Sequence, residues 1–124
     1  MAFVHSYRDL DVWRCAVDLA VNVTLMANRL PANELFALGL QLRRAAVSVS
    51  SNIAEGYGRS TRPEYIRFLR IARGSAAEVS SLLTITERLQ YVSSEDIGVS
   101  KALCERVSAM LTRLLQTLEG RRDD

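Results

Sequence analysis

TRPEYIRFLRIARGSAAEVSSLLTITERL, residues 61–89, has apolar side chains that recur every three or four residues. This spacing predicts one long helix over 62–89, with Thr61 as N-cap and Glu64 completing a capping box. Arg67, Arg70 and Arg73 are three residues apart, so their side chains cover an arc of about 120°. We therefore expect an amphipathic helix with one basic face and a core seam of Tyr65, Leu69, Ala72, Ala76, Val79 and Leu83.

Similar periodicity on both sides of this stretch predicts three further helices, at about 10–30, 34–55 and 95–119. Short loops join the four helices, so residues 1–124 are expected to form a single domain. The predicted fold is all-α, an antiparallel up-and-down four-helix bundle. The helix over 10–30 carries two adjacent apolar seams, which indicates contact with two helices of its own bundle, or with one of them and another subunit.

Residues with capping side chains or special backbones mark the expected helix ends. GYGRS, residues 56–60, is expected to separate the second and third helices, and it lacks the preceding strand and the GK[ST] ending of a phosphate-binding loop. Pro31 is expected to end the first helix and Gly120 the last. The expected N-caps of the other helices are Asp9 or Asp11, Asn33, and Ser93 or Ser94.

Composition excludes several kinds of protein. The chain has 124 residues, 48% hydrophobic and 24% charged, with two Pro and six Gly, which is typical of one globular helical domain. His5 is the only histidine and the two cysteines, Cys15 and Cys104, are far apart, so we expect no zinc site and no cofactor. No apolar run approaches the ~18 residues of a membrane span. We expect a soluble cytoplasmic protein with two reduced, packed thiols, the alternative being a disulfide.

Positive charge is concentrated in the middle of the chain. Residues 41–73 hold seven arginines against Glu55 and Glu64, a net charge of +5, whereas residues 74–124 hold six basic and eight acidic residues, a net charge of −2. Guanidinium groups bind phosphate oxygens in a two-pronged fashion, so this cluster is the candidate nucleic-acid-binding site. The alternative is a solvated face with a few salt bridges between subunits. The candidate residues are Arg43, Arg44, Arg59, Arg62, Arg67, Arg70 and Arg73.

Tyr57 and Tyr65 lie near this cluster in the sequence. Tyrosine rings there either stack on unpaired bases or pack against neighbouring side chains, and packing is the more common use of an aromatic residue beside a loop.

A polar stripe is predicted along the second helix, at Gln41, Arg44, Ser48, Ser51 and Glu55. Catalysis by an acid pair requires two carboxylates in one cleft, and only Glu55 with Glu64 or Glu78 is a candidate. Pairing of each carboxylate with an arginine is the simpler interpretation, so no catalytic residue is assigned. Asn52 is expected to meet Glu55 or Glu78 inside the bundle, the alternative being a subunit interface, and Arg44 is expected to pair with Glu55.

The runs QLRRAAVSVSSNIAEGYGR, residues 41–59, and EYIRFLRIARGSAAEV, residues 64–79, resemble the four-helix-bundle family encoded in intervening sequences of bacterial 23S ribosomal RNA genes. YRDLDVWRCAVDLA and LPANELFALGLQ are similar to its first helix and loop. Ser50 stands where the family usually has a proline, so a kink in the second helix is expected to be milder. The motif positions carried over are Arg43, Arg44, Asn52, Glu55, Gly56, Arg59, Gly74 and Ser75, and Gln41, Ser48 and Glu78 join them as expected structural positions.

The resemblance implies a bundle that assembles into a ring-like homopentamer. It also implies similarity to the basic pentameric accessory proteins of diversity-generating retroelements, which bind nucleic acid and a reverse transcriptase. We therefore predict a non-enzymatic, oligomeric protein that binds structured RNA through phosphate contacts. The alternatives are a scaffold that recruits a partner enzyme such as a reverse transcriptase and, least favoured, a hydrolase that uses Glu55.

Overall fold

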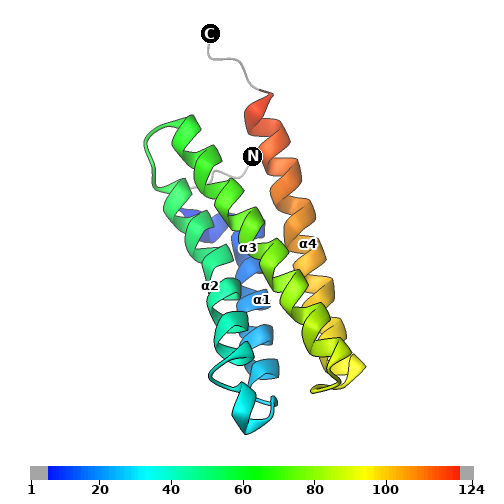
Figure 1. Ribbon diagram of the computed structural model, residues 1–124. Helices are drawn as coiled ribbons and strands as arrows, with labels where there is room; N and C mark the ends of the chain where they lie inside the picture. The colour runs from blue at the N-terminus through cyan, green and yellow to red at the C-terminus, as the bar shows by residue number, and fades with distance from the viewer. Residues whose placement is uncertain (1–5, 121–124) are drawn as a thin grey trace.

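The computed structural model describes residues 6–120, which form four α-helices side by side (Figure 1). Each helix packs on the next one along the chain and α4 closes the ring by packing on α1, so α1 lies diagonally across from α3. The predicted antiparallel four-helix bundle is confirmed. The elements are η1 Tyr7–Asp9, α1 Asp11–Ala27, η2 Ala32–Glu34, α2 Leu38–Tyr57, α3 Arg62–Arg88 and α4 Ser94–Glu119.

Apolar side chains from all four helices meet in one core. The predicted seam of α3 is buried except for Tyr65, which is half-buried, and in α4 the buried side chains include Leu111 and Leu115. The two seams of α1 have different environments. One seam, which includes Leu19 and Val23, is fully buried, whereas the other is only half-buried at Trp13, Val17, Ala20 and Thr24. One side of α1 is therefore incompletely covered within the chain.

The expected N-caps of the two later helices are confirmed, but the expected capping box of α3 is not formed, because the Glu64 carboxylate pairs with Arg67. The hydroxyl of Thr61 accepts a hydrogen bond from the backbone N–H of Glu64, and the hydroxyl of Ser93 accepts one from the backbone N–H of Asp96. Gly120 is the C-cap of α4. The Glu64 carboxylate pairs with Arg67, the same residue that lowers its pKa.

The expected cap of the first helix and the expected start of the second are wrong. Leu10 precedes α1 without a side-chain cap, and Asp9 instead belongs to a 3-10 turn capped by Ser6. Asn33 lies in η2 and does not cap α2, which begins at Leu38 after Ala37. The first helix ends at Ala27, ahead of Pro31, and the chain from Asn28 to Ala37 forms a turn that buries Leu30 but leaves Phe36 83% exposed.

Gly56 allows α2 and α3 to approach closely near their shared turn. A Cβ atom built on Gly56 lies 2.6 Å from Cβ of Phe68 and 3.2 Å from a ring carbon of Tyr65. No real Cβ sits that close to its neighbours, so only glycine fits at this position without a shift of α3. Helix α2 continues through Gly56 and ends at Tyr57, with Gly58 as its C-cap.

Both cysteines are buried and unbonded. The thiol of Cys104 donates a hydrogen bond to the carbonyl oxygen of Ala76 at 3.2 Å, and burial raises its pKa to about 11. Burial also raises the pKa of Cys15. These thiols stay protonated and serve as packing groups. Between residues 6 and 120, no helix has the length and hydropathy needed to cross a bilayer.

Candidate nucleic-acid interface

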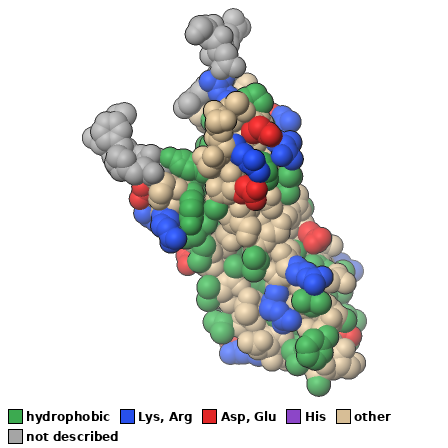
Figure 2. All heavy atoms as spheres, turned by 90° about the vertical axis from the view of Figure 1, so that its left-hand side faces the viewer, with side chains coloured by type: hydrophobic (Ala, Val, Ile, Leu, Met, Phe, Trp, Pro, Cys, Tyr) green, Lys and Arg blue, Asp and Glu red, His purple; other side chains and the backbone are tan. Residues whose placement is uncertain are grey.

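The seven candidate arginines lie on α2, on the turn that follows it and on α3. Arg43 is half-buried and donates from Nη2 to the carbonyl oxygen of Leu35 at 3.4 Å, so it supports the turn before α2. Arg44 is exposed on the neighbouring position of α2. Viewed from the α2 side, basic side chains form separate groups, and those near the upper end are mixed with acidic ones (Figure 2).

Arg59 and Arg67 flank the same phenylalanine at the turn between α2 and α3. Their guanidinium carbons lie 4.8 Å and 4.5 Å from the ring centroid of Phe68. Arg59 Nη2 bonds Glu55 Oε1 at 2.8 Å, and Arg67 Nε bonds Glu64 Oε2 at 2.8 Å. Stacking on an aromatic face together with a carboxylate partner fixes the plane of each guanidinium.

Two further arginines are engaged within the chain. Arg70 pairs with Glu119, which joins α3 to the last turn of α4. Arg62 is half-buried and also has an interaction within the chain. Within residues 6–120, Arg44 and Arg73 are the members of the cluster whose side chains make no hydrogen bond or ion pair. The expected pair of Arg44 and Glu55 is therefore wrong, because Glu55 pairs with Arg59, one turn away on the chain.

A polar network joins α2 and α3 at mid-height. The hydroxyls of Ser48 and Ser75 lie 2.8 Å apart, and Asn52 Nδ2 donates to the carbonyl oxygen of Ser48 at 2.8 Å and to its hydroxyl at 3.0 Å. Asn52 is thus satisfied by serine, and the expected partners Glu55 and Glu78 are wrong. The polar stripe itself is confirmed, since Gln41, Arg44, Ser51 and Glu55 are exposed and Ser48 is half-buried.

The remaining motif positions divide into packing and surface residues. Gly56 is a packing position, as described above. Gly74 and Glu78 are exposed on α3, and a Cβ atom built on Gly74 meets nothing within 4 Å. No clash inside the described chain therefore explains a glycine in the middle of a 27-residue helix.

The tyrosines near the cluster pack on each other. The ring centroids of Tyr57 and Tyr65 are 6.0 Å apart with an interplanar angle of 52°. Burial raises the pKa of Tyr65, whose ring also contacts the Gly56 position. Both side chains are half-buried, so these tyrosines pack against neighbouring side chains.

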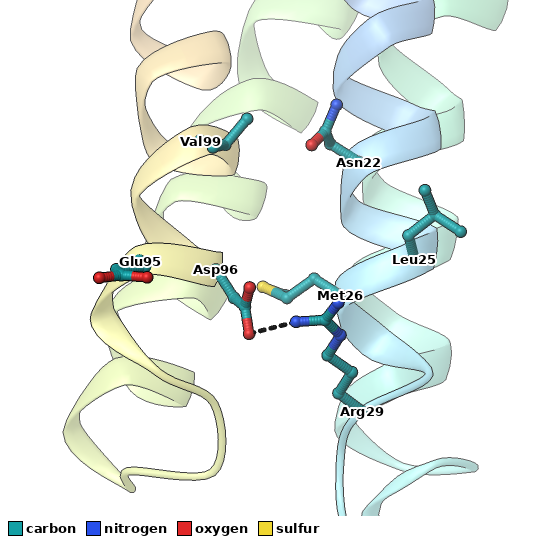
Figure 3. A pocket seen from close by; sticks show the side chains of 7 residues that line it. All are labelled: Asn22, Leu25, Met26, Arg29, Glu95, Asp96 and Val99. Atoms are coloured by element: carbon teal, nitrogen blue, oxygen red, sulfur yellow. Dashed lines mark ion pairs between the residues drawn. The ribbon is translucent and has the colours of Figure 1, made fainter.

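The acidic residues do not converge on a cleft. Glu55 and Glu64, the candidate acid pair, each bind a different arginine. Across the described part of the chain, no group of three or more His, Cys, Asp or Glu side chains is placed to hold a metal ion. A hollow of about 180 Å³ between α1 and α4 is instead lined by mixed side chains and crossed by the ion pair of Arg29 and Asp96 (Figure 3).

Phe68 is a residue of the site that the sequence pattern does not single out, because its spacing indicates only an apolar side chain beside the core seam. It is 7% exposed, so it does belong to the interior, yet its ring supports two guanidinium groups. The arginine that directly precedes it in the sequence is the only local signal for this role. The pairing of Arg70 with Glu119 has no local signal, since 49 positions separate them.

Comparison with known proteins identifies relatives of the whole bundle. The family model described as 23S rRNA-intervening sequence protein matches residues 8–113. A search of curated proteins finds no match. Among solved structures, a crystal structure from Bacteroides thetaiotaomicron, described as a protein with unknown function from the S23 ribosomal protein family, matches with a TM-score of 0.79. It is 22% identical, and the match covers 85% of this chain and 98% of that chain, so it supports the fold alone.

Proposed function

The chain belongs to the 23S rRNA-intervening sequence protein family, and from this premise we propose that it is a non-enzymatic, oligomeric, cytoplasmic protein that binds structured RNA. The proposed contacts run from arginine side chains of α2, the following turn and α3 to the phosphate backbone. The observation that carries the proposal is the concentration of seven arginines against two acidic residues in residues 41–73. Such a local excess is the electrostatic footprint of phosphate binding.

The ion pairs of three candidate arginines are exposed, which supports an exchange of their carboxylate partners for phosphates. The side chains of Arg59, Arg67 and Arg70 remain 44%, 57% and 56% exposed in their pairs. Exposed ion pairs contribute only about 0–1 kcal/mol, so a phosphate that takes both prongs of a guanidinium can displace the carboxylate. Arg44 and Arg73 need no exchange, because no partner in the described chain occupies them.

The ring of Phe68 adds a reason why Arg59 and Arg67 suit this role. A guanidinium already fixed over an aromatic face loses less side-chain freedom when it binds a ligand. Phosphate contacts of this kind position a nucleic acid without reading its bases. We therefore expect recognition by shape, with little dependence on sequence.

The test is fluorescence anisotropy with a structured RNA and a matched DNA duplex over a salt series. Log affinity should fall linearly with log salt, by about 0.9 for each phosphate contact on a duplex. The triple charge reversal Arg67→Glu, Arg70→Glu and Arg73→Glu should abolish binding while circular dichroism shows unchanged helicity. Undiminished binding by this variant would refute the assignment of the site.

Single alanine substitutions distinguish phosphate contacts of the unpaired arginines from an effect of the protein's net charge on RNA binding. Arg73→Ala and Arg44→Ala should each weaken binding and reduce the salt slope by about one contact. Arg113→Ala, which removes one exposed positive charge from α4, is the matched control and should leave the slope unchanged. Equal losses in all three variants would indicate that net charge, not this surface, drives binding.

A second candidate is a protein scaffold whose arginines bind an acidic surface of a partner enzyme such as a reverse transcriptase. The observation in its favour is that Arg59, Arg67 and Arg70 are already matched to carboxylates. Absence of RNA binding at ~50 mM salt, where phosphate contacts are strongest, would make this candidate the leading one.

A further inference from the structure

Phe36 is the most exposed large apolar side chain between residues 6 and 120. It lies in the turn that joins α1 to α2, and 83% of it is exposed. The other aromatic side chains in the described part of the chain are buried or half-buried, and they are Tyr7, Trp13, Tyr57, Tyr65, Phe68 and Tyr91. Phe36 is therefore the aromatic ring on which a group from another molecule can stack.

The backbone on both sides of Phe36 is held in place. The N–H of Glu34 donates to the carbonyl oxygen of Pro31 at 2.8 Å, and the N–H of Ala37 donates to that of Glu34 at 3.2 Å. Leu38, two residues after Phe36, is buried. A phenylalanine on a fixed backbone has two side-chain torsions left to lose when a ligand covers it, so binding here has a small entropic cost.

Arg43 holds the same turn against α2. Its Nη2 donates to the carbonyl oxygen of Leu35 at 3.4 Å, in the peptide bond that leads into Phe36. A Cβ atom built on Gly39 would lie 3.4 Å from Nη1 of Arg43, so the guanidinium packs closely between the turn and the start of the helix. This places one positive charge next to the backbone of the exposed phenylalanine.

The first half of α2 carries positive charge without acidic partners. Residues 35–54 contain Arg43 and Arg44 and no acidic residue, and Glu34, just before this stretch, is half-buried. Arg44 is exposed, makes no hydrogen bond or ion pair in the described part of the chain, and lies about 9 Å along the helix from its first residue. A phosphate can therefore reach an arginine here without displacing a carboxylate.

An exposed aromatic ring beside unpaired arginines is typical of sites that bind unpaired nucleobases. The base stacks on the ring and the arginines bind the backbone, and every base has a flat face that suits such stacking. Bases inside a duplex are covered by their neighbours, so proteins stack on the bases of loops, bulges and ends. A protein-binding patch has further apolar side chains around its aromatic anchor, whereas the exposed residues that are nearest in sequence are Asn33, Ala37 and Gln41.

The length of α2 relates Phe36 to the other candidate contacts. The turn with Phe36 and the turn after α2 lie at opposite ends of the bundle (Figure 1). The 20 residues of α2 span about 30 Å, which is close to one turn of a nucleic-acid duplex. A short stem that follows α2 from Arg59 to Arg44 would bring the loop that closes it to Phe36.

From these observations we propose that Phe36 stacks on an unpaired base of the bound RNA, while Arg44 binds an adjoining phosphate and Arg43 positions the turn. The inference rests on the proposed function and deepens it, because it names an RNA with unpaired bases beside a short stem as the preferred ligand. Stacking adds affinity without selecting one base over another.

The test compares two RNAs of the same total length, a hairpin with a stem of about ten base pairs and a single-stranded loop, and a blunt duplex. In anisotropy titrations the wild type should bind the hairpin about five- to 150-fold more tightly, the range that stacking of one base gives. Phe36→Ala should bind both RNAs as the wild type binds the duplex. Phe36→Tyr, which keeps a ring, should keep the preference, and Phe36→Leu, which keeps only apolar bulk, should lose it.

Two controls separate stacking from a general effect of the substitution. Val99→Ala removes part of an apolar side chain that is 52% exposed on α4, diagonally across the bundle from α2, and should keep the wild-type ratio of the two affinities. Phe36 lies outside the core, so Phe36→Ala should retain the helicity of the wild type in circular dichroism and its mass in light scattering.

A spectroscopic variant observes the stacking directly. In Phe36→Trp the added tryptophan should lose fluorescence when the hairpin binds and keep it when the duplex binds. The wild type gives the baseline signal of Trp13.

The outcomes distinguish this inference from the proposed function. Equal affinity of the wild type for hairpin and duplex, or a preference that survives in Phe36→Ala, would overturn the stacking and leave RNA binding in place. A Phe36→Ala variant that has a lower mass than the wild type and loses both RNAs equally would assign Phe36 to a contact between copies, and would also overturn it. A wild type that binds neither RNA would remove the proposed function, and this inference with it.

Discussion

Gly56 and Gly74 both lie inside helices, yet their surroundings differ. An alanine at Gly56 places its Cβ 2.6 Å from Phe68, and one at Gly74 meets nothing within 4 Å. Gly56→Ala should therefore destabilise the protein by about 1–3 kcal/mol through overpacking, whereas Gly74→Ala should stabilise it by about 0.5–1 kcal/mol through helix propensity.

Urea unfolding at two protein concentrations measures both effects and reveals any contribution from assembly. Opposite signs for the two substitutions are the expected outcome. A loss of stability in Gly74→Ala would show that the α3 backbone at this point is constrained in a way that the described contacts do not explain.

The free energy of unfolding should depend on pH through the carboxyl groups of Glu64 and Asp96. Hydrogen bonds from Arg67 and Arg29, respectively, lower their pKa values from the ordinary 4.5 and 3.8. A carboxyl whose pKa is lower in the folded state binds fewer protons there than in the unfolded state, so its stabilising effect is present above the ordinary value. That effect is lost as pH falls through the lowered value. Thermal melts should show Glu64→Gln and Asp96→Asn below the wild type at pH 7, with the difference shrinking toward pH 2.

At the scale of single helices, the starts of α3 and α4 depend on one hydroxyl each. Thr61 satisfies the backbone N–H of Glu64, so Thr61→Ala should lower the free energy of unfolding by about 1 kcal/mol. Ser60→Ala, at the exposed position just before it, is the control and should change little. Chemical denaturation measures both, and an equal loss in the two variants would mean that the turn, not the cap, is responsible.

The helices themselves could be predicted from the sequence because burial of one side imposes a period of three or four residues. The start of α2 and the cap of α1 could not. LPANELFAL, residues 30–38, has leucines at helical spacing, which favours a helix. In the structure Leu30 is buried from a turn and Leu38 from the first position of α2, so tertiary packing determines the backbone in this segment. Asn33 is exposed there and caps nothing.

The candidate site was predictable to a similar extent. Pairs within one turn, such as Arg59 with Glu55 and Arg67 with Glu64, follow from helical spacing. The partner of Arg70 lies on α4, and Ser48 meets Ser75 of α3, so only the packed bundle reveals these two contacts. Asn52, in contrast, bonds Ser48 four residues earlier on its own helix. Spacing therefore gives the faces of each helix and leaves unspecified what covers them.

At the scale of the whole molecule, assembly and RNA binding should be coupled. Several copies of a weak phosphate-binding surface bind one long RNA with higher overall affinity than a single copy, by about 10²-fold or more when the geometry fits. Wild type diluted until light scattering shows single chains should therefore bind structured RNA much more weakly than the assembled protein, although every candidate arginine is retained. Anisotropy titrations above and below that concentration check this, and equal affinities would show that each chain binds alone.

The closure of α4 onto α1 has a consequence for the order in which the protein forms. The remaining packed helix pairs, α1 with α2, α2 with α3 and α3 with α4, are neighbours along the chain. Most contacts can therefore form early, between segments of low sequence separation. Such topologies are associated with folding in microseconds to milliseconds. The contact of α1 with α4, which includes the pair of Arg29 and Asp96, requires the two ends of the chain to meet and is expected to form last. Weakening it with Arg29→Ala should consequently hasten unfolding and leave the refolding rate nearly unchanged.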